Sequence, residues 1–318
     1  MSDEIQTTVP LESVEQLLAE RLRGGDAVLA STRPILRHLL ANRDQSLFSD
    51  EVIARLRGMI GHVARQLLFA RAGADDMADP APFSARYQDG LAALLFDDVA
   101  FLAHAHALTL EAQLAESVQR RSAIDAVLSP LLQELTASPD EPTAAAAMRI
   151  IASQARFMQT YRRMELPLGE LPGDLFHKAL LLMRNHAGDD ESAARAESQL
   201  RAQFDEGQGR IGQLTRLVMA MGRKANRALA IDHAGLAIHS TALAMASGQD
   251  RNLTILSFGE NQLARLALSL RAAGLRQDAL EGQFLMLHPN AQLPDGFDRI
   301  TPGRAAVLLE ETAQKVAG

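Results

Sequence analysis

Apolar residues recur along almost the whole chain at intervals of three and four, the spacing of one face of an α-helix. Clusters of Gly, Pro and Asp interrupt this pattern at short intervals, as they do at helix ends. Strands favour β-branched and aromatic residues, and few runs of such residues occur here. The pattern therefore predicts an all-α protein, in which short loops join antiparallel helix pairs packed as a bundle or as an irregular α-solenoid-like array.

The breaks in the pattern predict where individual helices begin and end. We expect the first helix at about 11–22, because the Gly24-Gly25 pair that follows is a typical C-terminal stop. Ser49, followed by two acidic residues, is a typical N-cap and predicts a helix to about residue 70. Further helices are expected at 27–41, 83–95, 97–118, 122–137, 142–164, 173–186, 190–204, 210–230, 233–247, 260–273, 276–287 and 303–316.

One segment has the composition of a linker. Residues 72–82, from Ala72 to Pro82, are mostly small or acidic and include two prolines. We therefore place a domain boundary there, between an N-terminal helical segment, 1–72, and a helical-repeat-like body, 83–318.

Another segment resembles a known repeat. From Leu131 to Met148 the chain has leucines on a first helix, a Ser-Pro-Asp turn, and small residues at the start of a second helix. This stretch resembles the helix–turn–helix of a HEAT-type repeat, and a fainter echo lies between Leu36 and Leu56. The resemblance covers two helix pairs. It implies an α-solenoid-like arrangement and a surface for a macromolecular partner, without catalytic residues.

Composition narrows the functional classes. At 318 residues and 47% hydrophobic, the chain can bury one large or two ordinary cores. It contains no cysteine, which excludes disulfides, a thiolate nucleophile and Cys-based zinc or iron–sulfur sites. The net charge of −7 argues against a nucleic-acid binder in which the whole molecule takes part. The acidic start does not resemble a signal peptide, and no stretch reaches the ~18 apolar residues of a membrane span, so we expect a cytoplasmic protein.

A glycine motif in the second half resembles a dinucleotide fingerprint. Gly207, Gly209 and Gly212 match GxGxxG, and Asp232 follows twenty residues after the last glycine. The fingerprint requires a buried strand before the first glycine, whereas residues 195–206 are polar and helical in pattern. A dinucleotide site is therefore not expected. What remains is the hypothesis that amides at this helix start, helped by Arg210, bind a phosphate or carboxylate.

Asp97, His104 and Glu111 follow one another at intervals of seven and would form a stripe along one predicted helix. Metal-binding helical bundles use Glu-x-x-His pairs in addition, and no such pair occurs in the sequence. We therefore expect a solvated polar face and no metal, and keep these three residues only as weak candidate ligands. The HExxH, GxSxG and Walker A motifs are also absent from the sequence.

Arginines form two stripes within segments that lack acidic residues. Arg149, Arg156 and Arg163 recur every seven residues between Pro142 and Met164. The second segment, 207–231, contains Arg210, Arg216, Arg223, Lys224 and Arg227, and three of these arginines share a helical face (Arg216, Arg223 and Arg227). Guanidinium groups pair well with carboxylates and phosphates, so these stripes are candidate surfaces for an acidic partner. The alternative is that they pair with acids on neighbouring helices, such as those in 189–197.

Helix pairs without an assembled catalytic motif favour a non-enzymatic adaptor or regulatory protein. We expect it to bind another protein through faces that include the arginine stripes, without a cofactor. Two alternatives stay open. One is a metal- or anion-dependent enzyme that uses Asp97, His104 and Glu111, or the amides near Gly209. The other is a nucleic-acid-associated accessory protein, which requires the two stripes to be exposed and adjacent.

Overall fold

The computed structural model describes residues 10–41 and 50–316. Helix accounts for 82% of the structure, and the described residues contain no strand. The all-α fold class predicted from the hydrophobic period is confirmed. Residues 42–49, which include the predicted N-cap Ser49 and part of the fainter HEAT-like echo, lie outside the described residues.

The described residues form a succession of α-helices joined by short loops and 3₁₀ turns. The α-helices are α1 (Leu11–Ala41), α2 (Asp50–Ala74), α3 (Pro80–Asp97), α4 (Val99–Ser122), α5 (Pro130–Thr136), α6 (Glu141–Arg162), α7 (Gly173–Ala187), α8 (Glu191–Gln203), α9 (Arg210–Met221), α10 (Ile231–Ser247), α11 (Arg251–Leu256), α12 (Leu263–Ala272), α13 (Gln277–Leu287) and α14 (Pro302–Val316). The 3₁₀-helices are η1 (Leu168–Glu170), η2 (Glu206–Gln208), η3 (Gly222–Leu229), η4 (Glu260–Gln262) and η5 (Phe297–Arg299).

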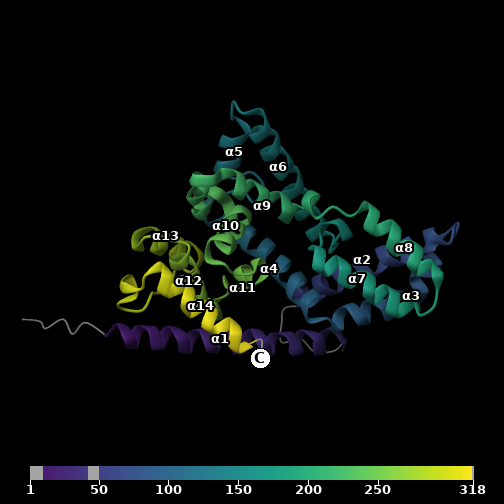
Figure 1. Ribbon diagram of the computed structural model, residues 1–318, viewed down its shortest axis with the longest axis horizontal. Coiled ribbons are helices and arrows are strands. Elements are labelled where there is room, and N and C mark those ends of the chain that lie inside the picture. The colour runs from purple at the N-terminus through teal and green to yellow at the C-terminus, as the bar shows by residue number, and fades with distance from the viewer. Residues whose placement is uncertain (1–9, 42–49, 317–318) are drawn as a thin grey trace, which may run out of the picture.

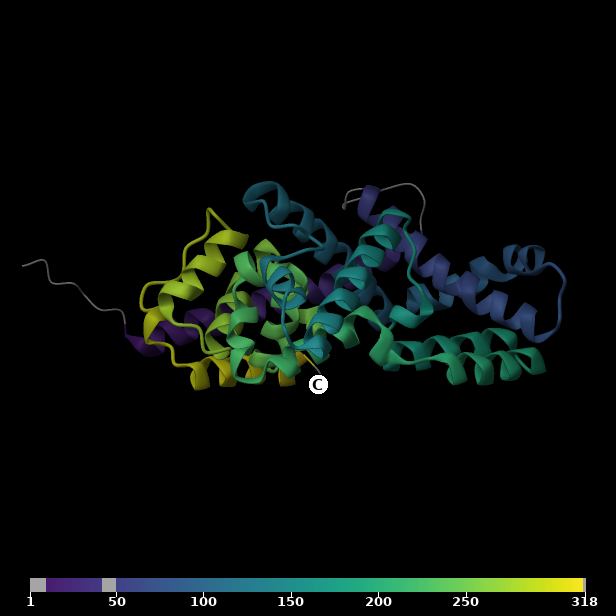
Figure 2. The same cartoon turned by 90° about the horizontal axis from the view of Figure 1, so that it is seen from above.

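The helices are grouped around two large hydrophobic clusters. The α2 cluster is built from α2, α3, α7, α8 and the first half of α4, and includes Leu67, Leu91 and Phe101. The α10 cluster is built from α5, α6, α9 to α14, the first half of α1 and the second half of α4, and includes Leu243 and Leu309. Figure 1 shows α1 along the base of both groups, with α5 and α6 projecting at the top. Seen from above in Figure 2, the α2–α3 and α7–α8 pairs form two layers.

Short polar side chains set the beginnings of many helices. The carboxylate of Asp98 accepts hydrogen bonds from the amides of Ala100 and Phe101, and Asp140 accepts from Thr143 at the start of α6. Prolines follow the N-caps of α3, α5 and α6, where a missing N–H costs nothing. Asp98 therefore ends α3 and starts α4, and these two helices meet at 89°. Among the described residues no single helix is long and apolar enough to cross a membrane, although the bent α3–α4 pair passes the same test by length and composition.

The predicted helix stop at Gly24-Gly25 is wrong, because α1 continues through both glycines. Gly25 lies where η4 packs against α1. The side-chain amide of Gln262 donates to the Gly25 carbonyl at 2.5 Å, and a Cβ on Gly25 would lie 3.0 Å from the Asn261 carbonyl oxygen. Glycine is therefore required at position 25 for close packing of the helix and not for its termination.

The predicted helix over 210–230 is also wrong, since α9 ends at Met221. Gly222 has φ 51°, a left-handed conformation that stops the α-helix, and the chain continues as η3. The helix expected at 122–137 begins only at Pro130, because Ala123 ends α4 with φ 55°.

The predicted linker, residues 72–82, joins α2 to α3. α2 reaches Ala74, a turn follows, and Asp79 caps α3. The two helices pack against each other within the α2 cluster. The domain boundary at this segment stays a prediction. At the HEAT-like stretch, α5 and α6 pack together as a helix pair around a turn at Ser138–Asp140.

Candidate functional site

The exposed face of α6, together with its C-cap residue Arg163, carries the first predicted arginine stripe. Arg149, Arg156 and Arg163 are all exposed, and neighbours in this row are about 10 Å apart along the helix axis. Their guanidinium groups form no ion pair or hydrogen bond with any other described residue. The predicted alternative, pairing with the acids of 189–197, is therefore wrong for this row: Asp190 pairs with Arg71 instead.

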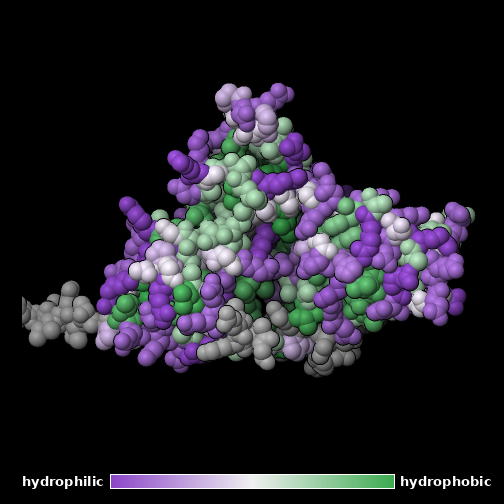
Figure 3. All heavy atoms as spheres, in the orientation of Figure 1, coloured by the Kyte–Doolittle hydropathy of each residue, from purple (hydrophilic) through white to green (hydrophobic). Residues whose placement is uncertain are grey.

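The remaining exposed positions of α6 extend this face. Two further rows with the same spacing lie beside the arginines: Ala145, Ala152 and Gln159, then Met148, Ala155 and Arg162, which continue from the exposed Glu141 at the start of the helix. Met148 is 58% exposed, which is high for a large apolar side chain. No acidic residue lies between Glu141 and Glu165. We call these three rows the α6 face; they combine positive charge, small side chains and one exposed apolar group. On the side of the molecule drawn in Figure 3, hydrophilic residues are spread over the surface, with patches of hydrophobic residues between them.

The second predicted stripe does not form one row. The break at Gly222 places Arg223 and Arg227 on η3, off the face of α9 that carries Arg216. Arg216 bonds to the Gly207 carbonyl, and Arg227 pairs with Glu134 of α5. Arg210, predicted to face a partner, is only 1% exposed.

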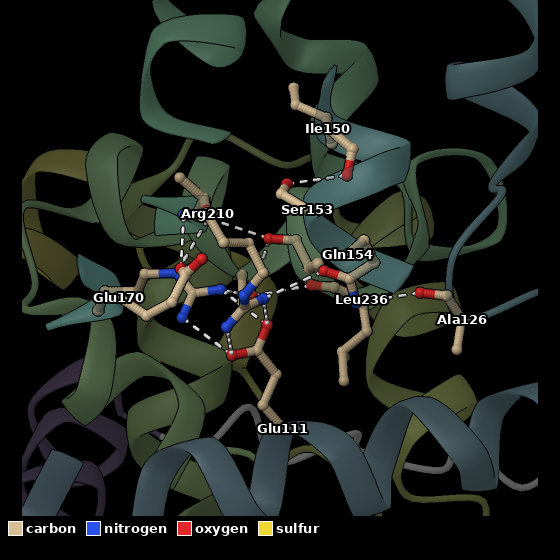
Figure 4. Close-up of polar contacts among 12 residues, drawn as sticks. Glu111, Ala126, Ile150, Ser153, Gln154, Glu170, Arg210 and Leu236 are labelled. Carbon is tan, nitrogen blue, oxygen red and sulfur yellow. Dashed lines mark hydrogen bonds and ion pairs between the residues drawn. The ribbon is translucent and has the colours of Figure 1, made fainter. Parts of the chain in front are cut away.

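Arg210 belongs to a buried polar cluster between the two hydrophobic clusters, which we call the Glu111 node (Figure 4). The carboxylate of Glu111, on α4, accepts hydrogen bonds from Arg210 at 2.6 and 2.9 Å. It accepts two more from Arg251, on α11, at 2.9 and 3.0 Å. Gln154 of α6 accepts from Arg210 at 3.2 Å and donates to the Ala126 carbonyl. The node thus ties α4, α6, α9 and α11 together.

The node has two cations for one carboxylate, and this shapes the local pKa values. Burial alone would raise the pKa of Glu111, but the guanidinium groups of Arg210 and Arg251 outweigh it and hold that pKa well below its usual range. His104, two turns earlier on α4, is fully buried and bonds through Nδ1 to the Asn252 side chain at 3.0 Å. Burial, helped by the two arginines, lowers the pKa of His104 to about 4, so the ring is neutral at pH 7.

The predicted carboxylate–histidine stripe does not assemble. Asp97 is the last residue of α3 and is exposed, whereas His104 and Glu111 on α4 are buried. The expected solvated polar face is therefore wrong, since this side of α4 faces the node and not water. In the part of the chain that the structure describes, no group of three or more His, Cys, Asp or Glu residues has the geometry to hold a metal ion.

The amide at the start of α9 binds a carboxylate, but this carboxylate is a side chain of the same protein, that of Glu170. Gly209 is the N-cap, and the Arg210 amide donates to Glu170 of η1 at 2.7 Å. The element before Gly207 is the helix α8, and Gly207 itself lies in η2, so the GxGxxG match does not have the strand that a dinucleotide-binding site requires. A helix start favours an anion, and at α9 an internal carboxylate takes that place.

Sequence reasoning identified Glu111 and Arg210 separately but not as partners, and it did not single out Arg251 or Gln154. Glu111 is 99 residues from Arg210 and 140 residues from Arg251. No local spacing links residues so far apart. No protein-family model, curated protein or solved structure matches the chain.

Proposed function

We propose that this protein is a non-enzymatic helical adaptor or regulatory protein that binds an acidic helix of another protein along the α6 face. The observation that supports the proposal best is that Arg149, Arg156 and Arg163 are exposed and pair with no residue that the structure describes. Elsewhere many arginines of this chain pair with carboxylates, among them Arg71, Arg195 and Arg304. Three aligned guanidinium groups without a carboxylate partner among the described residues are complementary to an acidic surface.

The rows beside the arginines favour a helix as the partner element. Alanines at 145 and 152 allow a second backbone to come close, and Met148 offers an apolar contact. A helix with acidic residues every seven positions would place one carboxylate opposite each arginine. The HEAT-like resemblance of the α5–α6 pair supports the same interpretation, because HEAT-type repeats present helix faces to partners.

The two alternatives have less support. Of the enzyme candidates, Glu111 is engaged by two arginines, and the amide of Arg210 at the start of α9 is engaged by Glu170. The nucleic-acid alternative needs two adjacent exposed stripes, whereas the second stripe is broken at Gly222 and partly paired. A single row of three arginines on a chain of net charge −7 favours a protein partner.

The test is charge reversal of the row. We expect R149E, R156E and R163E together to leave the circular dichroism spectrum unchanged, because all three side chains are exposed and have no partner among the described residues. The triple variant should fail to bind a fluorescent helical peptide with glutamates every seven residues, and should lose the proteins that wild type captures at low salt. Binding by wild type should weaken between about 50 and 300 mM salt, roughly as screening predicts.

The matched control reverses three exposed arginines elsewhere, R65E, R120E and R121E, and changes the net charge equally. We expect it to bind the peptide as wild type does. Equal loss of binding in the control would mean that the change in net charge, and not the position of the arginines, weakens peptide binding. If the triple variant of α6 captures the same proteins as wild type, the partner surface lies elsewhere. If wild type preferentially captures nucleic acid, the accessory-protein alternative is favoured.

A further inference from the structure

Behind the α6 face lies a pocket of about 200 Å³, enclosed by α2, α4, α6, α9 and the loop that leads into η1. It opens where the two hydrophobic clusters meet, beside the Glu111 node. The floor is apolar and partly aromatic; it is formed by Met59, Leu108, Phe157, Tyr161, Leu166 and Ile211. Sites for drug-sized ligands measure roughly 300–1,000 Å³, so this pocket has room only for a small molecule.

The wall opposite α6 is held firmly in place. Two α2 side chains bind the loop: His62 Nδ1 accepts from the Leu166 amide at 3.1 Å, and the Gln66 side chain donates to the Leu166 carbonyl at 2.9 Å. Gly58 allows α2 to approach Met164, since a Cβ there would lie 2.8 Å from the Met164 carbonyl oxygen. The pocket is therefore built into the fold rather than left between mobile segments.

Charges of both signs line the pocket without pairing with one another. Arg156 contributes a guanidinium, and Glu165 and Glu170 contribute carboxylates. Neither carboxylate forms an ion pair with a described residue, and only Glu170 Oε2 is engaged, by the Arg210 amide. The fourth charge, Arg210, pairs with Glu111, which it shares with Arg251, and its guanidinium lies 3.8 Å from the centroid of the Phe157 ring.

We propose that this pocket binds a free α-amino acid with an apolar side chain. The side chain fills the apolar floor, the ammonium group meets Glu165 and Glu170, and the carboxylate meets Arg156. A simple carboxylic acid would bring a negative charge against two carboxylates, and a simple amine would leave Arg156 unpaired. A small zwitterion with an apolar body matches all three features at once.

The proposal predicts a defined ligand preference in calorimetric titrations of the full chain. L-leucine should bind, and 4-methylpentanoate and 3-methylbutylamine, which lack its ammonium and its carboxylate, should each bind at least about tenfold more weakly. L-glutamate, whose side chain is charged, should not compete. Equal binding of 4-methylpentanoate and L-leucine, or no heat from L-leucine or from the larger probe L-phenylalanine, would overturn the proposal.

A variant at Glu165 tests the ammonium end of the ligand. E165Q should lower the affinity for L-leucine at least about tenfold, because its ammonium group loses a carboxylate partner. The affinity for 4-methylpentanoate should stay unchanged or rise, because one repulsive negative charge is removed. R149Q, on the same helix as Arg156 but outside the pocket, should bind L-leucine as wild type does. If E165Q binds L-leucine normally, the ammonium site is wrong. This test is independent of the proposed partner surface, since Arg149 and Arg163 belong only to the α6 face and Glu165 only to the pocket.

Discussion

One carboxylate, that of Glu111, accepts hydrogen bonds from the buried guanidinium group of Arg210 and the partly buried one of Arg251. We predict that E111Q lowers the free energy of unfolding by about 3–5 kcal/mol, because the buried Arg210 and the partly buried Arg251 would both lose their counter-charge. Urea denaturation followed by circular dichroism measures the change. The control is E134Q, which breaks the exposed pair with Arg227 and should leave stability nearly unchanged. A small effect of E111Q would mean that water replaces the carboxylate in the node.

The residues of the candidate sites were predictable to very different degrees. The row on α6 follows from a local rule, because a spacing of seven places Arg149, Arg156 and Arg163 on one side of any helix. The structure adds only that this side is exposed. The partners of Glu111 follow from no such rule, since they come from α9 and α11. A polar residue at a helical spacing looks the same in sequence whether it faces water or a buried counter-charge.

Two adjacent glycines in α1 allow a test of why the helix contains them. A Cβ on Gly24 would meet no heavy atom within 4 Å, whereas a Cβ on Gly25 would face Gln262 and the Asn261 carbonyl. We predict that G24A stabilises the protein by about 0.5–1 kcal/mol through helix propensity, and that G25A destabilises it despite the same propensity gain. Thermal unfolding of the two variants checks this. Equal stabilisation by both would mean that η4 moves away from α1 without cost.

At the level of elements, the sequence was informative wherever a local signal decides the outcome. The period of apolar residues acts within a few residues, and helices such as α7, α8 and α13 were predicted within one or two residues of their ends, whereas the cap Asp98 was placed inside the helix expected at 97–118. The predictions at two glycines were wrong in opposite ways: a helix end was predicted at Gly25 and none at Gly222. Gly25 permits close packing and Gly222 ends a helix, and the difference lies in the neighbouring helix and in φ rather than in the local sequence.

Buried histidines make the stability of the whole molecule depend on pH. Burial lowers the pKa of both His104 and His239 to about 4, compared with 6.5 for an exposed ring. Between pH 6.5 and 4 the unfolded chain therefore binds protons that the folded chain does not. Stability should fall on acidification across this window, by about 1 kcal/mol per pH unit for each ring. Urea titrations at about pH 5, 6 and 7 measure the slope, and H104Q should reduce it by about that amount.

A slope that is the same in H104Q and wild type would show that His104 takes up a proton without unfolding. A second variant, H239Q, separates the two rings: His239 lies in α10 and donates through Nδ1 to the Leu229 carbonyl, whereas His104 bonds to Asn252. Each variant should reduce the change of unfolding free energy with pH by the contribution of its own ring, because the two rings titrate in different parts of the molecule.

The route of α1 along the base of the molecule has a consequence for the order in which the protein is made. Asp26 pairs with Arg265 and Glu15 pairs with Arg304, at sequence separations of 239 and 289 residues. At synthesis rates of about 5–20 residues per second, α1 waits roughly 10 to 60 s on the ribosome for these partners. Its apolar side chains Leu18 and Leu22, fully buried in the finished fold, are exposed for that time. We therefore expect α1 to need chaperone protection during translation until α12 and α14 have been made.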